Sequence, residues 1–378
     1  MSSQSPEATP RKVRVAVVFG GRSTEHAISC VSAGRILQAI DRERYEVVPI
    51  GITPEGRWVL AADEPEKLAI TGGRLPAVEE SGTSLVLAGD PTSRQLVVQE
   101  SGRVPHALGQ VDVVFPVLHG PYGEDGTLQG LLELAGIPYV GSGVFASAAA
   151  MDKGHMKALF LAAGLPLGPY ELIEPRAWRT DRDGVHARVR DRLHLPVFVK
   201  PCRAGSSLGI TKVNRWEEFG TAVEEAARHD PRVVVEEGIE GRELECGVLG
   251  GRRGGAPEAS VLAEIRVRGG HEFYDFEAKY LDDATELDVP ADVAPEVSEQ
   301  AQALACRTFD VLGCEGLARV DFFLRADGTL LVNEVNTMPG FTPVSMFPRM
   351  WAASGLDYPA LVERLLQLAR ERPAGLLR

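Results

Sequence analysis

Two largely apolar segments in the first third of the chain constrain its fold more than any other feature. Residues 13–19, which end at a pair of glycines, and residues 111–118, which end at a polar turn, are rich in valine. A strand that is buried on both faces has such a sequence, which is typical of a parallel sheet covered by helices. Residues 29–40 predict a helix and residues 46–52 a second strand, so this order predicts an α/β unit.

The later segments predict smaller α+β units. Residues 58–110, rich in glycine, proline and short strand-like pieces, predict an insertion on the first domain. A single helix is expected over residues 146–163, and a strand, a Gly/Ser loop and a further strand over residues 196–213. Residues 316–324 and 330–333 predict a β-hairpin.

These segments suggest several domains. We expect a disordered tail over residues 1–12, an N-terminal domain over 13–148, a central domain over 149–239 and a C-terminal domain over 240–378. An irregular loop over about 266–288 carries aromatic and charged residues, so it is predicted to act as a lid.

The composition excludes several kinds of protein. The chain has 40 Lys and Arg against 53 Asp and Glu, a net charge of −13, which argues against nucleic acid as the main partner. No run reaches the roughly 18 apolar residues of a membrane span, and the polar N-terminus is unlike a signal peptide. The 5 cysteines are scattered without a CxxC pair, so we expect a cytoplasmic protein without a disulfide framework.

The segment from Lys200 to Gly209 (KPCRAGSSLG) places a lysine ahead of a Gly/Ser loop. Backbone N–H groups of such a loop can surround phosphate oxygens, and the lysine supplies a point charge. The same residues also suit an ordinary hairpin turn, and their spacing is not that of a Walker A loop. The residues alone therefore leave both readings open.

A second candidate site lies on the predicted hairpin. Arg319 and Asp321 share one face of a strand, and Glu334 and Asn336 share a face on or just beyond the next strand. Pairing would bring three oxygen ligands together, as Mg²⁺ requires alongside substrate phosphates. A solvated sheet face is the alternative, but the flanking residues are apolar, and acidic groups in such strands need a partner or a metal.

Other residues stand out less clearly. Glu25 follows the first strand, where a carboxylate could favour a helix start or bind an ammonium group. Gly340 follows the possible metal strand, and its N–H could stabilise an oxyanion or merely form a turn. The chain has only 7 lysines, which makes Lys153 and Lys279 notable.

Taken together and in this order, several segments resemble D-alanine–D-alanine ligases, ATP-grasp enzymes of peptidoglycan precursor synthesis. The resemblance extends from Val13 to about Leu368. It implies an α/β chain in which a preATP-grasp N-terminal domain precedes an ATP-grasp fold that holds ATP between two β-sheets. The segments are GGRSTEHAIS, LHGPYGEDGTLQG, GSGVFASAAAMDK, VFVKPCRAGSSLG, VVVEEGIEGREL, EFYDFEAKYLD, ARVDFF and NEVNTMPGFTPVS.

The resemblance implies a nucleotide site. Lys153 and Lys200 would contact the phosphates, and Glu236 with the backbone through Ile239 would hold adenine. Glu237 stands where many relatives carry a lysine beside the adenine. The full set implied to bind the nucleotide, with its ribose and γ-phosphate contacts, is Lys153, Lys200, Ser206, Ser207, Glu236, Glu237, Ile239, Glu243, Lys279, Phe323 and Glu334.

The resemblance also implies a metal site and an oxyanion site. Asp321, Glu334 and Asn336 would bind two Mg²⁺ ions, for which Mn²⁺ could substitute, and a monovalent cation is a further candidate. Arg319 and the Gly340 N–H would form an oxyanion site.

The amino acids would bind at two places. Glu25, with His119 nearby, would bind the ammonium group of the first D-alanine. Ser345 and the Met346 backbone would bind the carboxylate of the second, and Arg319 would also contact substrate. The full set implied to act in catalysis is Glu25, Ser206, Tyr280, Arg319 and Gly340.

Several alternatives stay open. Tyr280, which would be linked by hydrogen bonds to Ser206 and Glu25, favours a dipeptide product, because relatives that make D-alanyl-D-lactate usually lack it. A D-lactate or D-serine ligase, another ATP-grasp ligase and a non-catalytic nucleotide-binding protein are the alternatives. A dinucleotide oxidoreductase is disfavoured because G-x-G-x-x-G is absent. The implied partners are ATP, D-alanine and a second copy of the chain, joined through the N-terminal domain.

Overall fold

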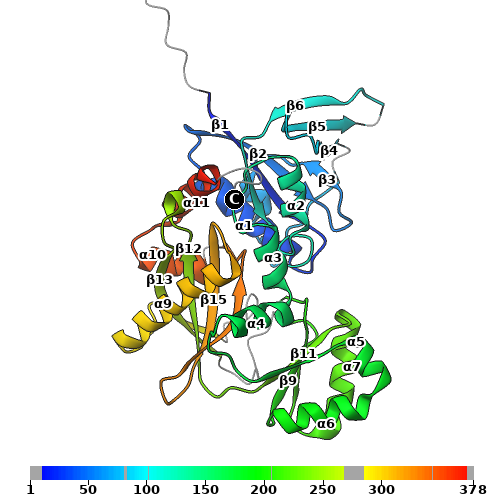
Figure 1. The fold of residues 1–378 in the computed structure, drawn as a ribbon. Coiled ribbons are helices and arrows are strands. Elements are labelled where there is room, and N and C mark those ends of the chain that lie inside the picture. Colours follow the sequence, from blue (N-terminus) through cyan, green and yellow to red (C-terminus); the bar gives the residue numbers. More distant parts are fainter. Residues whose placement is uncertain are drawn as a thin grey trace, which may run out of the picture.

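The computed structural model describes residues 11–80, 83–100, 102–205, 207–267, 285–342 and 344–372. Within these ranges the strands form three sheets that are covered by helices (Figure 1). No helix among the described residues is long and apolar enough to cross a membrane. The predictions for Ser206, Lys279, Tyr280 and most of the lid fall outside the described residues.

The strands of the first sheet are β1 (Val13–Gly20), β2 (Tyr45–Ile52), β3 (Trp58–Leu60), β4 (Thr83–Leu87), β5 (Gln95–Glu100), β6 (His106–Gln110) and β7 (Val113–Val117). They lie in the order β6-β5-β4-β3-β2-β1-β7. β1 pairs in parallel with both β2 and β7, which confirms the predicted α/β unit. β3 to β6 continue the sheet as antiparallel strands, so the predicted insertion extends the same sheet.

Helices cover both faces of the first sheet. α1 (His26–Ala39) packs on one face beside the last helix of the chain, α11 (Tyr358–Glu371), in one hydrophobic core. α2 (Thr127–Leu134) packs on the other face. Figure 1 shows α11, at the red end of the colour range, next to α1. The C-terminal helix therefore completes the N-terminal core.

The helix predicted over residues 146–163 is in fact two helices, α3 (Val144–Met151) and α4 (Lys153–Ala162). Asp152 between them has an extended backbone, and its carboxylate accepts hydrogen bonds from the N–H groups of Gly154 and His155. The prediction of a single helix was wrong because Asp152 caps α4 and so starts a new helix.

The central sheet is antiparallel, with the order β10-β9-β11-β8. Its strands are β8 (Tyr170–Ile173), β9 (Val197–Pro201), β10 (Thr211–Val213) and β11 (Val233–Glu237). β9 and β10 are the strands predicted around the Gly/Ser loop. The helices packed with its core are α5 (Pro175–Thr180), α6 (Arg182–Arg192) and α7 (Phe219–His229), and α7 follows the 3-10 turn η2 (Trp216–Glu218).

The third sheet has the order β14-β13-β12-β15-β16. Its strands are β12 (Arg242–Leu249), β13 (Glu258–Val267), β14 (Thr285–Asp288), β15 (Leu317–Leu324) and β16 (Leu330–Asn336). The predicted hairpin is confirmed as β15 and β16. The lid bounds 266–288 were wrong at both ends, because Arg266 pairs with Glu286 in the ladder between β13 and β14.

Two helices pack against this third sheet on different faces. α9 (Pro295–Leu312) shares the core that also holds side chains of α3 and α4. α10 (Met346–Ala353) packs near β12, where a Cβ added to Gly247 would lie 2.9 Å from Trp351 Nε1, so this strand position has room only for glycine. Two further 3-10 turns are η1 (Pro65–Leu68) and η3 (Arg252–Gly254).

Candidate active site

A cavity of about 460 Å³ lies between the central sheet and the third sheet. Every predicted site residue that the structure describes lines it. Residues far apart in the sequence are thus brought together, whereas Ser206, Lys279 and Tyr280 lie outside the described residues. The predicted residues in the lining are Glu25, His119, Lys153, Lys200, Ser207, Glu236, Glu237, Ile239, Glu243, Arg319, Asp321, Phe323, Glu334, Asn336, Gly340, Ser345 and Met346.

Strands β15 and β16 present their polar residues to the cavity. Asp321 lies opposite Glu334 and Arg319 opposite Asn336 in the antiparallel register. Val320, which lies between Arg319 and Asp321 on β15, is fully buried in the core on the other side of the sheet. The expected sharing of one face is therefore confirmed, and alternation along the two strands explains it.

Arg319 is held between two carboxylates. Its Nε and Nη2 each donate to one oxygen of Asp321 at 2.7 Å, and Nη2 also lies 3.2 Å from Glu245 Oε1. Burial would lower the pKa of Arg319, but these carboxylates raise it well above its ordinary value. The sequence analysis missed Glu245, although Glu243 and Glu245 alternate in an apolar strand, which was a usable signal.

The donor set at this place fits Mg²⁺. Asn336 Nδ2 donates to Asp321 Oδ2 at 3.1 Å, so the amide and one carboxylate already touch. Glu334, opposite Asp321, adds a second carboxylate. Mg²⁺ takes hard oxygen ligands of this kind, keeps several waters and shares its shell with phosphates.

Glu236 on β11 accepts hydrogen bonds from two lysines. Lys200 Nζ lies 2.5 Å from its Oε2, and Lys157 Nζ lies 2.7 Å from its Oε1. Burial would raise the pKa of Glu236, but the two ammonium groups hold it well below its usual range. Burial would likewise lower the pKa of Lys200, but Glu236 raises it. The sequence analysis gave Lys157 no role, and its only signal was the scarcity of lysine.

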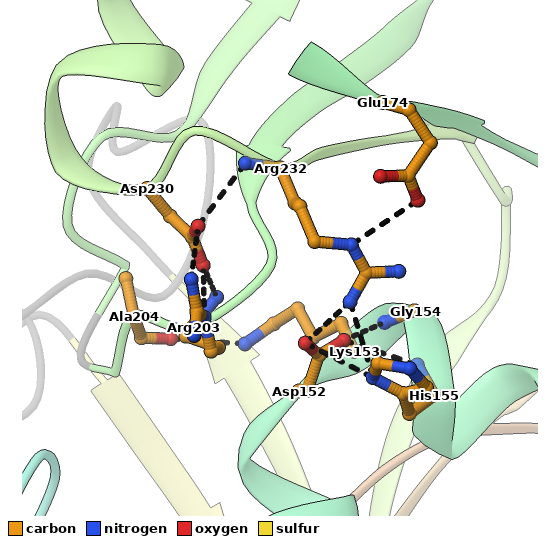
Figure 2. A network of polar contacts seen from close by, with 9 residues as sticks. All are labelled: Asp152, Lys153, Gly154, His155, Glu174, Arg203, Ala204, Asp230 and Arg232. Carbon is orange, nitrogen blue, oxygen red and sulfur yellow. Dashed lines mark hydrogen bonds and ion pairs between the residues drawn. The ribbon is translucent and has the colours of Figure 1, made fainter. Parts of the chain in front are cut away.

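A polar network anchors the start of the Gly/Ser loop to the junction of α3 and α4 (Figure 2). Arg232 Nη1 donates to Asp152 Oδ2 at 2.6 Å, and Arg232 Nε donates to Glu174 at 3.2 Å. Arg203, at the start of the loop, binds Asp230 through its backbone N–H and its guanidinium at 2.8–2.9 Å. The Arg232 N–H also donates to Asp230, which joins both halves of the network.

This network places Lys153 at the edge of the cavity. The Lys153 N–H donates to Cys202 O and its Nζ to Ala204 O, both at 3.0 Å. The same Nζ lies 3.6 Å from Glu334 Oε2 on β16. The loop and the third sheet therefore hold this ammonium group between them.

The residues predicted to bind the adenine and ribose of the nucleotide come from β11, β12 and β15 and from the segment after β11. Glu243 on β12 and Phe323 on β15 lie opposite each other in the ladder. Glu237 Oε2 accepts from the His194 N–H at 2.8 Å, so this carboxylate is attached to the turn before β9. Ile239 follows β11 and also lines the cavity.

The N-terminal domain contributes Glu25 and His119. A Cβ added to Gly205 would lie 3.4 Å from Glu25 Oε2, so the carboxylate reaches the Gly/Ser loop. His119 Nδ1 lies 3.0 Å from Met338 O, whereas its buried Nε2 has no hydrogen-bond partner within the described part of the chain. Both groups suit a polar ligand in the cavity.

Ser345 and Met346 lie where α10 begins. Ser345 Oγ accepts from the Thr342 N–H at 3.0 Å and lies 2.8 Å from Thr342 Oγ1. Met346 is the first residue of the helix, whose N–H groups and dipole favour a carboxylate. Gly340 lies on the loop between β16 and this helix and lines the cavity.

Glu124 is a cavity residue that the sequence analysis did not single out. Its Oε2 accepts from the Gly120 N–H at 2.7 Å and its Oε1 from the Met338 N–H at 3.0 Å. Burial raises the pKa of Glu124 to about 8, against these N–H groups and with help from the charge of Glu25. Glu124 thereby joins an N-terminal loop to the segment after β16.

The ion pair between Asp152 and Arg232 is expected to stabilise the fold. Asp152→Asn keeps a good helix cap but removes the charge facing Arg232, so unfolding should become easier by roughly 1–3 kcal/mol. Denaturant unfolding measures the change. Arg215→Met is the matched control, because it breaks only an exposed pair with Glu218 and should leave unfolding nearly unchanged. Equal small effects of both variants would contradict the prediction.

Glu124 predicts a pH dependence of stability. The unfolded carboxyl loses its proton near its ordinary pKa of 4.5, while the folded one keeps it up to about 8. The unfolded state therefore binds fewer protons in this interval, and the free energy of unfolding should fall with rising pH by at most about 1.4 kcal/mol per pH unit. Glu124→Gln has no titrating carboxyl at this position, so this part of the pH dependence disappears. The hydrogen bond that the substitution removes changes the free energy of unfolding by the same amount at every pH. Parallel stability–pH curves of the two proteins would refute the raised pKa.

Known proteins resemble the chain over nearly its full length. Sequence models of the N-terminus and the C-terminus of D-Ala–D-Ala ligases match residues 14–142 and 159–367. A D-alanine–D-alanine ligase of Streptomyces griseus is 57% identical over 99% of this chain and 97% of its own length. One of Mycolicibacterium vanbaalenii is 58% identical over 97% of this chain and 99% of its own.

Solved structures agree with these sequence matches. The VanG D-Ala:D-Ser ligase of Enterococcus faecalis is 35% identical, with a TM-score of 0.82 over 95% of this chain and 100% of that one. The D-alanine–D-alanine ligase of Coxiella burnetii is 38% identical, with a TM-score of 0.79 over 96% of this chain and 94% of that one. The chain therefore belongs to the D-alanine–D-alanine ligase family and has its ATP-grasp fold with an additional N-terminal domain.

Proposed function

We propose that the protein joins two D-alanine molecules to D-alanyl-D-alanine with ATP, for peptidoglycan precursor synthesis in the cytoplasm. The observation that carries this proposal is one cavity lined by Lys153 and Lys200, by the oxygen-bearing side chains Asp321, Glu334 and Asn336, and by Glu25 and Ser345. ADP and phosphate are the other products, because a carboxylate must be activated before an amine can attack it.

The first step would transfer the γ-phosphoryl group of ATP to the first D-alanine. Lys153 and Lys200 would hold the phosphates, and Ser207 belongs to the loop beside them. Glu236 and the Ile239 backbone would hold adenine, with the ribose near Glu243 and Phe323. The predicted roles of Ser206, Lys279 and Tyr280 would complete this site.

Asp321, Glu334 and Asn336 would hold two divalent cations, Mg²⁺ or Mn²⁺, and a monovalent ion could bind as well. When bound, such cations neutralise phosphate charge.

The second step would be attack of the second amine on the acyl phosphate. Negative charge then develops on the former carboxyl oxygen, and Arg319 with the Gly340 N–H would stabilise it. Because Asp321 and Glu245 already orient the guanidinium, little reorganisation is needed during the reaction.

The two amino acids would bind on different sides of the cavity. Glu25 would take the ammonium group of the first D-alanine, and the buried His119 Nε2 lies near enough to line the same space. Ser345 and the N-terminal N–H groups of α10, from Met346 onward, would take the carboxylate of the second.

We infer domain boundaries at residues 13–148, 149–239 and 240–378, and a homodimer formed through the N-terminal domain. The packing of α3, α4 and α11 in cores that span these boundaries would hold the three units together.

Arg319→Ala tests the oxyanion role. Turnover should fall about 10²–10³-fold, while the Kd of ATP should change far less, because the charge is needed in the transition state. Single-turnover rates and equilibrium ATP binding measure the two quantities. Arg242→Ala, which breaks a pair with Glu264 on the same sheet but outside the cavity lining, is the control and should keep its turnover. Near-normal turnover of Arg319→Ala would show that Arg319 does not stabilise the oxyanion.

The similarity to a D-Ala:D-Ser ligase makes D-serine the second candidate for the attacking amine. We expect phosphate release from ATP with D-alanine alone, none with L-alanine, and little mixed product when D-serine or D-lactate competes with D-alanine at neutral pH. Phosphate assay and mass spectrometry of the products provide the readout. Preferential formation of a D-serine dipeptide or a D-lactate depsipeptide would overturn the assignment of the second substrate.

A further inference from the structure

Lys157 is a buried lysine for which the proposed reaction has no use. Its side chain is 4% exposed, and its Nζ lies 2.7 Å from Glu236 Oε1. Lys200 binds the other oxygen of the same carboxylate at 2.5 Å. These three side chains carry two positive charges and one negative charge in a place largely shielded from water, and the charges of Glu334 and Glu243 act on Lys200 more weakly.

The two lysines are held differently. Lys157 rises from α4, donates to the backbone O of Asn333 on β16 at 3.4 Å, and its Nζ lies 5.6 Å from the centre of the Tyr170 ring on β8. These contacts come from elements on three sides, so Lys157 is fixed beside Glu236. Lys200 lies on β9, and it lines the cavity together with Lys153, Lys157 and residues of the Gly/Ser loop.

A buried carboxylate needs a counter-ion, and one ammonium group is enough to neutralise it. With Lys157 present, the charge of Lys200 remains as a surplus that can act on a polyanion in the cavity. Without Lys157, Glu236 would take up the charge of Lys200 and the cluster would become neutral. Attraction for phosphate would then fall.

We propose that Lys157 is a positioning residue that neutralises Glu236 and thereby leaves the charge of Lys200 available for the phosphates of ATP. This inference rests on the proposed function, since it takes ATP as the substrate and Lys200 as its phosphate contact. It goes beyond that function by assigning one lysine to the protein's own carboxylate and the other to the ligand.

The proposal predicts that Lys157→Met weakens ATP binding about 10–100-fold, the usual loss for one charge-assisted hydrogen bond. The KM for D-alanine should change less than about twofold, because no step at the amino acids involves this cluster. Isothermal titration of the full chain with ATP and Mg²⁺, without D-alanine, measures the Kd directly. Lys67→Met is the matched control, because Lys67 pairs with Glu64 at 2.5 Å on the exposed surface.

A double-mutant cycle separates this role from simple packing. A Glu236→Gln background lacks the carboxylate that accepts the hydrogen bond of Lys200, so adding Lys157→Met should change the Kd of ATP by less than about threefold. A purely structural role of Lys157 predicts the same loss in both backgrounds. Equal loss in both, or no loss in the Glu236 background, overturns the proposal.

Thermal unfolding of the variants and ATP binding by the unmodified chain distinguish the possible reasons for a negative result. If Lys157→Met does not fold, as judged by thermal unfolding, Lys157→Gln replaces it in the same cycle, because glutamine can still donate to Asn333 O. If the unmodified chain does not bind ATP at all, the proposed function fails. If it binds ATP and the cycle shows no coupling, only the role of Lys157 fails.

Discussion

The pairing of buried charges is the constraint on which the cavity depends. A charged group that leaves water must find a partner of opposite sign or it destabilises the fold. Here Arg319 lies between Asp321 and Glu245, and Glu236 lies between Lys157 and Lys200. Each group is therefore fixed in place by its partners, and a set of oriented charges faces the same space. Such preorganised charges are what phosphoryl and acyl transfer require.

These pairs also explain why no single sheet could form the site. The carboxylate of Glu236 comes from the central sheet, but Lys157 stands on α4, whose apolar side chains pack in the core of the third sheet. Glu124 binds the Met338 N–H and so ties an N-terminal loop to the segment after β16. The helix α11 fills the core of the first sheet from the other end of the chain. The cavity exists only where the three parts meet.

Local patterns predicted some elements well and others poorly. Residues 13–19 were recognisable because a strand buried on both faces is largely apolar along its length, and the observed β1 is parallel to two neighbours. The break at Asp152 was not recognisable, because the alanine-rich sequence around it favours helix throughout and only the capping bonds of its side chain reveal the new start. The ends of the predicted lid were wrong for a similar reason: Arg266 and Glu286 are strand residues only through their pairing with each other.

The sequence by itself determined the residue types of the site and their order, since motif spacing is a property of the chain. Alternation along β15 and β16 was enough to place Arg319, Asp321, Glu334 and Asn336 on one face. Only the tertiary structure decided which distant charges become partners. Lys157, Glu245 and Glu124 acquire their importance from burial against groups on other elements, and burial is set by packing rather than by neighbours in sequence.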